Sequence, residues 1–453
     1  MVTFYIGCSF SFNKIMLENS LLTPSAKCVS MYKTNIECYP SGPFKCKTIV
    51  SMRAMHKDKL SQIHQITSPL KDVHGAPIHY GNPSAIGIPN LKDCFAGKTT
   101  DFDADEIPVF WACGMTAFEA ISTAGLELAF THGPGSVFLT DVLQENIKEA
   151  KDPKELCEVI EYSPGMYSAL SKHAVDKLEA LDKIVQCDLG KRGIDQLIVE
   201  GDFIKAALAL SHANKVAIVT GAPVHQTHEQ PDETDGLPGV ISLAAALQSL
   251  DKTIDVLADS YSFTVIQKII SKCVKTGLLK SPVTVIQAQD LSMVYQKDVP
   301  KYDVVVAAYS IQDLSSEIKQ LTKDITDATK FPNVVAITLV HKSEKKPTDN
   351  INKSNEIHAG LTIQTANLNL AFWSMSWSLY TLMSCPIHER YVRKAIGFPM
   401  DVAGMMKKWL PSIDTVKKTK SIMQECYTAD TTGNTFNVLE NLLVEMEQIA
   451  DKK

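Results

Sequence analysis

The stretch KVAIVTGAPVHQTHEQPDETDGLPGVISLAAALQSLDKTIDVLAD, residues 215–259, decides the fold class of this 453-residue chain. Two short apolar runs, residues 216–219 and 253–257, have the length and the β-branched composition of buried strands. Between them, residues 240–250 carry apolar side chains at helical spacing, and Pro238 stands where a first helical turn tolerates proline. Strand, loop, helix and strand in this order predict a parallel βαβ unit, so the fold class is α/β.

The loop after the first of these strands is dense in ionisable side chains, with two histidines and four acidic residues within residues 225–235. Ligands of parallel sheets bind outside the carboxyl ends of the strands, where this loop lies. One interpretation is a site in which Glu233 or Asp235 binds a cationic group or a metal, beside Thr220, Gly221 and the helix start at Gly239. The other interpretation is a solvated acidic loop whose glycines and prolines only set turns.

In the first 141 residues, strands are expected at residues 2–6, 48–52, 106–111 and 127–131. Ser9, Arg53, Cys113 and His132 follow these strands, and His79 lies in a turn-rich loop. Glycines beside them allow close approach of a ligand, and the side chains supply donors, acceptors and proton carriers. We expect the loops that end in Ser9, His79, Cys113 and His132 to converge on one cleft, although each cysteine or histidine alone is more typical of a core or loop residue. Arg53 is as typical of an ion pair as of an anion-binding site. Thr116 and Glu119 also match a capping box, which predicts a helix start.

Composition excludes several classes of protein. An apolar fraction of 45% and a charged fraction of 21% are those of a globular protein. A net charge of −6 without a basic block argues against a nucleic-acid partner. The most apolar segment, residues 368–383, is too short to span a membrane. Dinucleotide and P-loop glycine motifs are absent from the sequence, so no nicotinamide or flavin is expected. Eleven cysteines without zinc-site spacing indicate reduced thiols.

The chain is expected to form two α/β domains joined by a helical connector. The first domain covers residues 1–141 and, because it begins within a strand pattern, is expected to be incomplete at its start. Residues 142–200 form the connector, in which residues 152–161 and 166–186 show helical apolar spacing. Residues 201–453 form the second domain, with a Rossmann-like parallel sheet.

Long motifs in both domains resemble the D-glutamate cyclase family. The first domain carries GCSFSF from Gly7, HGAPIHYGNP from His74, PVFWACGMT from Pro108 and THGPGSVFLTD from Thr131. Bacterial relatives of this module are labelled hydro-lyases. TGAP and ETDGLPG, within residues 220–239, resemble the module that animal cyclases fuse behind the first. The resemblance implies closure of D-glutamate to 5-oxo-D-proline with loss of water, in the mitochondrial matrix or otherwise in the cytoplasm.

The second domain departs from the family pattern at two motifs. Relatives carry Glu-Arg-Ala-Gly after the strand at residues 303–307, where this chain has Ala-Tyr-Ser-Ile. The family's Gly-Asp-Gly-Gly-Asn-Glu loop has no counterpart between Pro332 and Asn369. The alternative function is therefore that of a catalytically impaired relative, which keeps the fold as a small-molecule-binding or regulatory protein.

The implied reaction needs a base for the substrate ammonium and a donor for the departing carboxylate oxygen. We assign the catalytic roles to Glu233, Asp235, His132 and His79. We assign the binding of D-glutamate to Ser9, Arg53, Cys113, Thr220, Gly221 and Gly239. A divalent metal is compatible with these residue types, which do not identify its ligands. If the acidic loop binds the ammonium, Asp235→Asn should cut turnover by about tenfold.

Overall fold

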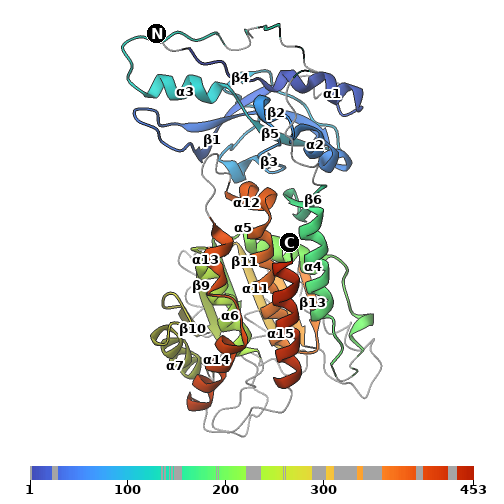
Figure 1. The fold of residues 1–453 in the computed structure, drawn as a ribbon, viewed down its shortest axis with the longest axis vertical. Coiled ribbons are helices and arrows are strands. Elements are labelled where there is room, and N and C mark those ends of the chain that lie inside the picture. Colours follow the sequence, from blue (N-terminus) through green and yellow to red (C-terminus); the bar gives the residue numbers. More distant parts are fainter. Residues whose placement is uncertain are drawn as a thin grey trace. The chain divides into compact units, whose positions relative to one another are not determined.

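The computed structural model divides the chain into two compact units, each described here by itself (Figure 1). The first unit is Met1–His173 with Cys385–Met400, and the second is Ala174–Ser384 with Asp401–Lys453. The structure describes residues 3–22, 29–133, 136, 139–141, 143, 146, 156–189, 191, 193–220, 236–258, 260, 262–287, 302–310, 334–339, 360–393, 401–426 and 436–452.

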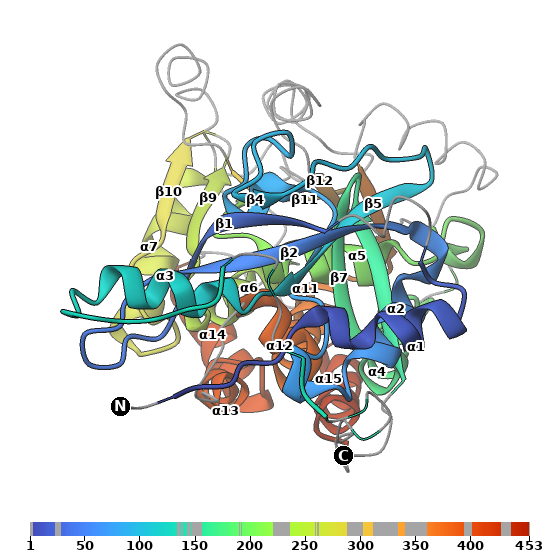
Figure 2. The same cartoon turned by 90° about the horizontal axis from the view of Figure 1, so that it is seen from above.

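An antiparallel five-stranded sheet forms the centre of the first unit, in the order β3-β5-β2-β1-β4 (Figure 2). Its strands are β1 (Ser30–Glu37), β2 (Lys47–His56), β3 (His79–Tyr80), β4 (Ala96–Gly97) and β5 (Glu106–Ala112). Residues 48–55 of β2 are all buried, because both faces of this central strand are covered. Side chains alternate between the faces, so Phe110 packs in one apolar cluster and its neighbours Val109 and Trp111 in another.

Short helices accompany this sheet: the 3₁₀ turns η1 (Ser9–Phe12) and η4 (Lys71–Val73), and the α-helices α1 (Asn13–Glu18), α2 (Leu60–Thr67) and α3 (Met115–Thr123). The capping box predicted at Thr116 and Glu119 is wrong, because the helix is capped by Gly114 without a side-chain bond. The Thr116 hydroxyl instead accepts the Ile49 amide at 3.0 Å. The Thr116 hydroxyl is therefore used by the backbone of β2 and does not cap α3.

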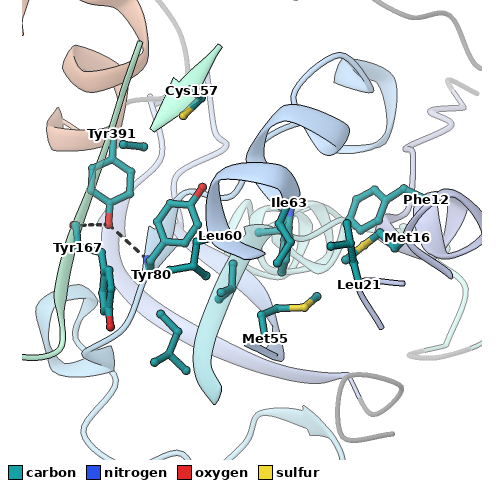
Figure 3. Close-up of a cluster of buried hydrophobic side chains, with 14 of the residues drawn as sticks. Phe12, Met16, Leu21, Met55, Leu60, Ile63, Tyr80, Cys157, Tyr167 and Tyr391 are labelled. Atoms are coloured by element: carbon teal, nitrogen blue, oxygen red, sulfur yellow. Dashed lines mark hydrogen bonds between the residues drawn. The ribbon is translucent and has the colours of Figure 1, made fainter. Parts of the chain in front are cut away.

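A hairpin and a late helix complete the first unit: β6 (Cys157–Ser163), β7 (Met166–Ser171) and α12 (Pro386–Arg393). Tyr391 of α12 enters the larger apolar cluster (Figure 3). Its hydroxyl donates to the Tyr167 carbonyl at 2.9 Å and accepts the Tyr80 amide at 3.3 Å. Residues distant in the sequence therefore close one core.

Two helices predicted for residues 142–200 are wrong in part. Residues 157–163 form β6, and residues 166–171 form β7, so only α4 (Lys172–Val185) is helical as predicted. The two strands of the hairpin pair along their length. Their small and β-branched residues suit a pleated surface as well as a helix face. Residues 151–155 lie outside the described part of the chain.

Two strands predicted in the first module are also wrong. Residues 3–6 and 127–131 are irregular, and Phe4 and Phe130 are about four-fifths exposed. Neither run has a partner strand within the described residues, so its apolar side chains find no surface on which to pack.

A six-stranded parallel sheet forms the second unit, in the order β10-β9-β8-β11-β12-β13. The strands are β8 (Lys215–Val219), β9 (Thr253–Ala258), β10 (Thr284–Gln287), β11 (Val304–Ser310), β12 (Val334–Leu339) and β13 (Leu361–Thr365). Numbered from β8, this is the doubly wound order 3-2-1-4-5-6, with a switch point between β8 and β11. The α/β class and the Rossmann-like sheet are confirmed.

The helices of the second unit are α4, α5 (Asp202–His212), α6 (Leu237–Ser249), α7 (Phe263–Lys275), α11 (Leu368–Ser384), α13 (Val402–Lys407), α14 (Ile413–Cys426) and α15 (Phe436–Asp451). Helix α11 is buried along almost its whole length, which accounts for its continuous apolar sequence. Among the helices that the structure describes, none has the length and hydropathy needed to cross a bilayer.

Candidate active site

Arg53 is the centre of the candidate site. It lies inside β2, opposite Val109 of β5, and not at a strand end as predicted. Its side chain is fully buried. The guanidinium carbon lies 5.1 Å from the ring centre of Phe12 and 5.5 Å from that of Trp111. These faces stabilise a cation by their negative charge density, but they do not replace a counterion.

The hydrogen-bond partners of Arg53 are all neutral. Nη2 donates to the Ser9 carbonyl at 3.2 Å and to Oδ1 of Asn13 at 3.1 Å, and Nη1 lies 3.5 Å from the Ser9 hydroxyl. Nε is buried and has no partner in the described part of the chain. No described carboxylate lies within ion-pair distance of this guanidinium. A buried cation with a free donor is costly, and a bound anion would compensate this cost.

Burial lowers the pKa of Arg53 to about 10, while the neighbouring Cys8 and Cys113 thiols raise it. The guanidinium therefore stays charged at neutral pH. This combination of burial, charge and an unused donor matches the recognition of a carboxylate, because arginine binds carboxylates through paired N–H groups.

His74 brings a titratable ring to the same place. It ends η4 in the left-handed region, with φ of 86°, a conformation that costs energy for a residue other than glycine. Burial lowers the pKa of His74, the Arg53 charge lowers it further, and a hydrogen bond to the Gly7 carbonyl raises it. The ring is therefore held neutral near pH 7, with one nitrogen oriented by Gly7.

Gly7 is required by its packing. A Cβ at this position would lie 1.9 Å from the carbonyl oxygen of Asp72, so the chain can approach η4 only without a side chain. This contact seats the Gly7-Cys8-Ser9 segment beside His74. The glycine was predicted to allow close approach of a ligand; it instead allows close approach of the η4 backbone, and residues 3–6 before it form no strand.

Cys113 reaches the site from the end of β5. Its amide donates to the Ile49 carbonyl at 3.0 Å, and α3 starts two residues later. Burial raises the pKa of Cys113, and the Cys8 thiol also raises it, whereas the Arg53 charge lowers it. The half-buried thiol stays protonated at neutral pH and can donate a hydrogen bond.

The structure thus places Ser9, Arg53 and Cys113 near one another, with His74 beside them. His79 lies elsewhere, in β3 opposite Phe110, with Nε2 2.7 Å from the Asn82 carbonyl oxygen. Its Nδ1 lies 3.5 Å from the Tyr391 hydroxyl, so both ring nitrogens face partners in the core.

His132 is exposed, and its Nδ1 lies 2.8 Å from the Gly133 carbonyl oxygen. This geometry satisfies the ring locally. The sequence places His74 in the same turn-rich loop as His79, where a loop histidine is the more typical interpretation, so it was not among the assigned site residues. The signal for it is the His-Gly pair of the turn at residues 74–75, which has left-handed backbone.

In the second unit, the described residues of the predicted site have structural partners. The Thr220 amide donates to the Leu257 carbonyl at 3.0 Å. The Gly239 amide donates to Oδ1 of Asn369 at 2.9 Å, and a Cβ at Gly239 would lie 2.7 Å from Cβ of Phe372. Gly239 therefore allows α6 to pack closely on α11. Gly221, Glu233 and Asp235 lie outside the described residues.

Within the described ranges, no three His, Cys, Asp or Glu side chains are grouped so that they could hold a metal ion.

Comparison with known proteins finds a separate family match in each of the two units. Residues 2–141 match the family model for D-glutamate cyclase, and residues 181–355 match the model for the D-glutamate cyclase-like C-terminal family. The human protein described as mitochondrial D-glutamate cyclase is 29% identical over 93% of this chain and 74% of its own length.

Bacterial relatives match the first unit only. Proteins described as hydro-lyases from Rhizobium johnstonii and Bordetella pertussis are 45% and 43% identical over 31% and 32% of this chain. The chain spans about half of their length, 54% in both cases. The first module is thus similar to the D-glutamate cyclase family, and the second module to the D-glutamate cyclase-like C-terminal family.

Proposed function

We propose that this chain closes D-glutamate to 5-oxo-D-proline with loss of water, and that the first unit carries the chemistry. The observation that carries the proposal is Arg53, a fully buried cation with neutral partners and an unused Nε donor. A dicarboxylate substrate supplies the missing anion. The relationship to the human mitochondrial cyclase supports the substrate, and it supports a mitochondrial location.

Arg53 would bind one substrate carboxylate and hold it by paired donors, which Nε and Nη can supply on one edge of the guanidinium. The extended substrate must fold back so that its amine meets the side-chain carboxyl, and fixing one carboxylate reduces the freedom that opposes this. The dry, aromatic surroundings of Phe12 and Trp111 strengthen each charge interaction at the site.

His74 is the proposed base. An ammonium cannot attack, so one proton must leave the nitrogen before the N–C bond forms, and a neutral imidazole can accept it. The lowered pKa of His74 keeps the ring neutral at physiological pH. A second proton leaves the nitrogen later, and the departing carboxylate oxygen gains two protons and leaves as water.

Cys113 is proposed to stabilise the oxygen on which negative charge develops. Its thiol stays protonated because burial raises its pKa, so it can donate a hydrogen bond there. Ser9, whose hydroxyl lies 3.4 Å from that of Ser51, can donate a second one. His79 and His132 take no part in this proposal, since local groups satisfy them.

The test is a product assay on the purified full chain with D-glutamate, reading 5-oxo-D-proline by chiral chromatography, with L-glutamate in parallel. Arg53→Met should lower turnover by roughly 10² to 10³-fold, as loss of an anion-stabilising donor does. Its melting temperature should stay level or rise, because replacing a buried charge by an apolar side chain removes a desolvation cost. Arg390→Met, on the exposed surface of α12, is the matched control.

Retained product formation in Arg53→Met would contradict the assignment to the first unit. The second candidate function is a binding or regulatory protein, favoured by the altered Ala308-Tyr309-Ser310 motif, which forms the end of β11. In that case D-glutamate would bind, as titration calorimetry would detect, without forming product.

A further inference from the structure

Cys38 and Cys46 face each other at the loop end of the β1–β2 hairpin, where residues 38–46 connect the two strands. The last strand pair there is Glu37 with Lys47, and the two cysteines form the next opposing pair. The Cys38 amide donates to the Cys46 carbonyl at 2.9 Å, which makes them a hydrogen-bonded pair. Directly opposed residues of this kind have Cα atoms about 5.5 Å apart, within the range of about 4.4–6.8 Å that a disulfide spans.

The two thiols meet on the same face of the hairpin. Directly opposed residues of a strand pair point to the same face, Cys38 is an electrostatic neighbour of Cys46, and Sγ of Cys38 lies 3.3 Å from the Thr48 hydroxyl. Both cysteines are partly exposed, so a small oxidant can reach them. Cys273 and Cys426, which also neighbour each other, are both buried and lack this access.

We propose that Cys38 and Cys46 form a reversible disulfide when the protein meets a peroxide, and that this disulfide loosens the start of α3. The Cys38 sulfur attacks one peroxide oxygen, the O–O bond breaks, and a sulfenic acid forms with release of water. The Cys46 sulfur then attacks the sulfenic sulfur and expels a second water. Two thiols lose two electrons and two hydrogens, and the peroxide gains them.

The order of these steps follows from the two environments. Burial raises the pKa of Cys46 to about 11, and the charges of Cys38, Glu119 and Glu37 raise it as well. Cys46 therefore stays a thiol, and Cys38 is the sulfur that the oxidant meets first. A second thiolate or a dithiol reductant reverses the bond by exchange.

The link to α3 is a contact of Cys46. Its thiol donates to the Thr116 carbonyl at 3.7 Å, in the first turn of α3. Forming the disulfide removes this S–H donor and draws the sulfur toward Cys38. Because α3 begins two residues after Cys113, the change falls next to the candidate active site.

The experiment uses the full chain, reduced and then treated with hydrogen peroxide, followed by blocking of free thiols and peptide mass spectrometry. We expect the Cys38–Cys46 cross-linked peptide in most molecules, its loss in Cys38→Ser and in Cys46→Ser, and its return to thiols with dithiothreitol. Cys94→Ser, a partly exposed cysteine of the same unit, is the matched control and should leave the cross-link unchanged. Absence of this peptide, with oxidation at other cysteines or at none, would overturn the proposal.

Hydrogen exchange tests the effect on α3. The Thr116 and Ala117 amides bond to the carbonyls of Cys113 and Gly114 at 3.0 Å, so they report on the first turn. We expect both to exchange several-fold faster after oxidation and to recover on reduction, with no change in Cys46→Ser. Equal exchange in the cross-linked and reduced proteins would refute the coupling. Neither readout needs a substrate, so the result is independent of the proposed activity.

Discussion

The two units carry their functional side chains in different ways. In the second unit, sequence and fold direct attention to the carboxyl edge of a parallel sheet, at the switch point between β8 and β11. In the first unit, the most unusual side chain, Arg53, lies inside the central strand of an antiparallel sheet. A charge within an apolar strand is therefore the centre of our candidate site, and residues after strand ends, such as Cys113, only contribute to it.

The two units also differ in whether the groups predicted to bind a ligand already have hydrogen-bond partners. The Gly239 amide, at the start of α6, already donates to Asn369. Arg53 keeps a buried Nε without a partner among the described residues. A donor that already has an acceptor stabilises the fold. A buried donor without an acceptor costs free energy, and a ligand that accepts its hydrogen bond would remove this cost. This contrast is the reason that we assign the chemistry to the first unit.

The largest expected effect is that of His74→Asn. Asparagine tolerates the left-handed backbone of this position, so the turn is retained, but it cannot accept the ammonium proton. Turnover should fall by roughly 10² to 10⁴-fold, the usual contribution of a positioned base, with little change in the melting temperature. In the wild type, kcat/KM should decline on the acid side at a pKa below 6.5, and the His74→Asn variant should lack this limb.

His74→Gly is a second variant that keeps the backbone and removes the ring. If either variant retained the acid limb with near-normal turnover, another group would be the base. The first unit would then no longer supply the proposed base.

Acidification should affect the two units in opposite directions. Burial lowers the pKa of His64, in the first unit, to about 4 from an ordinary value of 6.5. The unfolded chain binds this proton more readily, so the first unit loses stability as the pH falls from 6.5 to 4. The linkage contributes on the order of 3 kcal/mol, at about 1.4 kcal/mol for each pKa unit.

Asp182, in the second unit, has the opposite effect on the pH dependence of stability. Burial raises its pKa to about 6, so the folded state binds the proton more readily and gains stability as the pH falls from 6 toward 4. Urea unfolding at pH 7 and pH 5, followed by hydrogen exchange in each unit, measures both trends. His64→Phe should weaken the acid sensitivity of the first unit, and an equal decline in both units would contradict the linkage.

The sequence predicted the second unit better than the first for a physical reason. Buried parallel strands appear as continuous apolar runs, and residues 216–219 and 253–257 became β8 and β9 with helix α6 between them. The first unit depends on contacts between distant residues, such as Tyr391 with Tyr80 and Tyr167, which no local pattern reports. The hairpin β6–β7 was missed for a different reason, because its small and β-branched residues suit a pleated surface as well as a helix face.

The site was predicted in part. Ser9, Arg53 and Cys113 were chosen because glycines and polar residues surround them, and the structure places them together. His79 and His132 fit the same pattern, but sequence cannot tell that the Asn82 and Gly133 carbonyls already satisfy their rings. The partners of a side chain, more than its type, separate these cases.

Gly239→Ala tests the assignment of the second unit. The new methyl group would press on Phe372, so we expect a loss of about 1–3 kcal/mol in the free energy of unfolding from overpacking. Turnover per folded molecule should be unchanged, because this amide binds Asn369 in our assignment. Gly133→Ala is the control, since the nearest atom to its added methyl is 3.8 Å away. Lost turnover in a stable Gly239→Ala protein would place the substrate at α6.

The smallest expected effect is that of Asp235→Asn, in the acidic loop outside the described residues. The substitution keeps size and hydrogen bonding but removes the charge. If the loop bound the substrate ammonium, turnover should fall by about tenfold, the low end for a positioned charge contact. With the chemistry in the first unit, the change should leave turnover within about twofold, because the lost charge then touches no reacting group.

We expect the smaller change, measured as kcat and KM for D-glutamate beside Glu233→Gln as its acidic neighbour. A tenfold fall in kcat/KM for either variant, with the Arg53→Met effect still present, would show that both units contribute groups to turnover. A tenfold fall while Arg53→Met remained active would reverse the comparison, because the site would then belong to the parallel sheet whose edge the sequence first indicated.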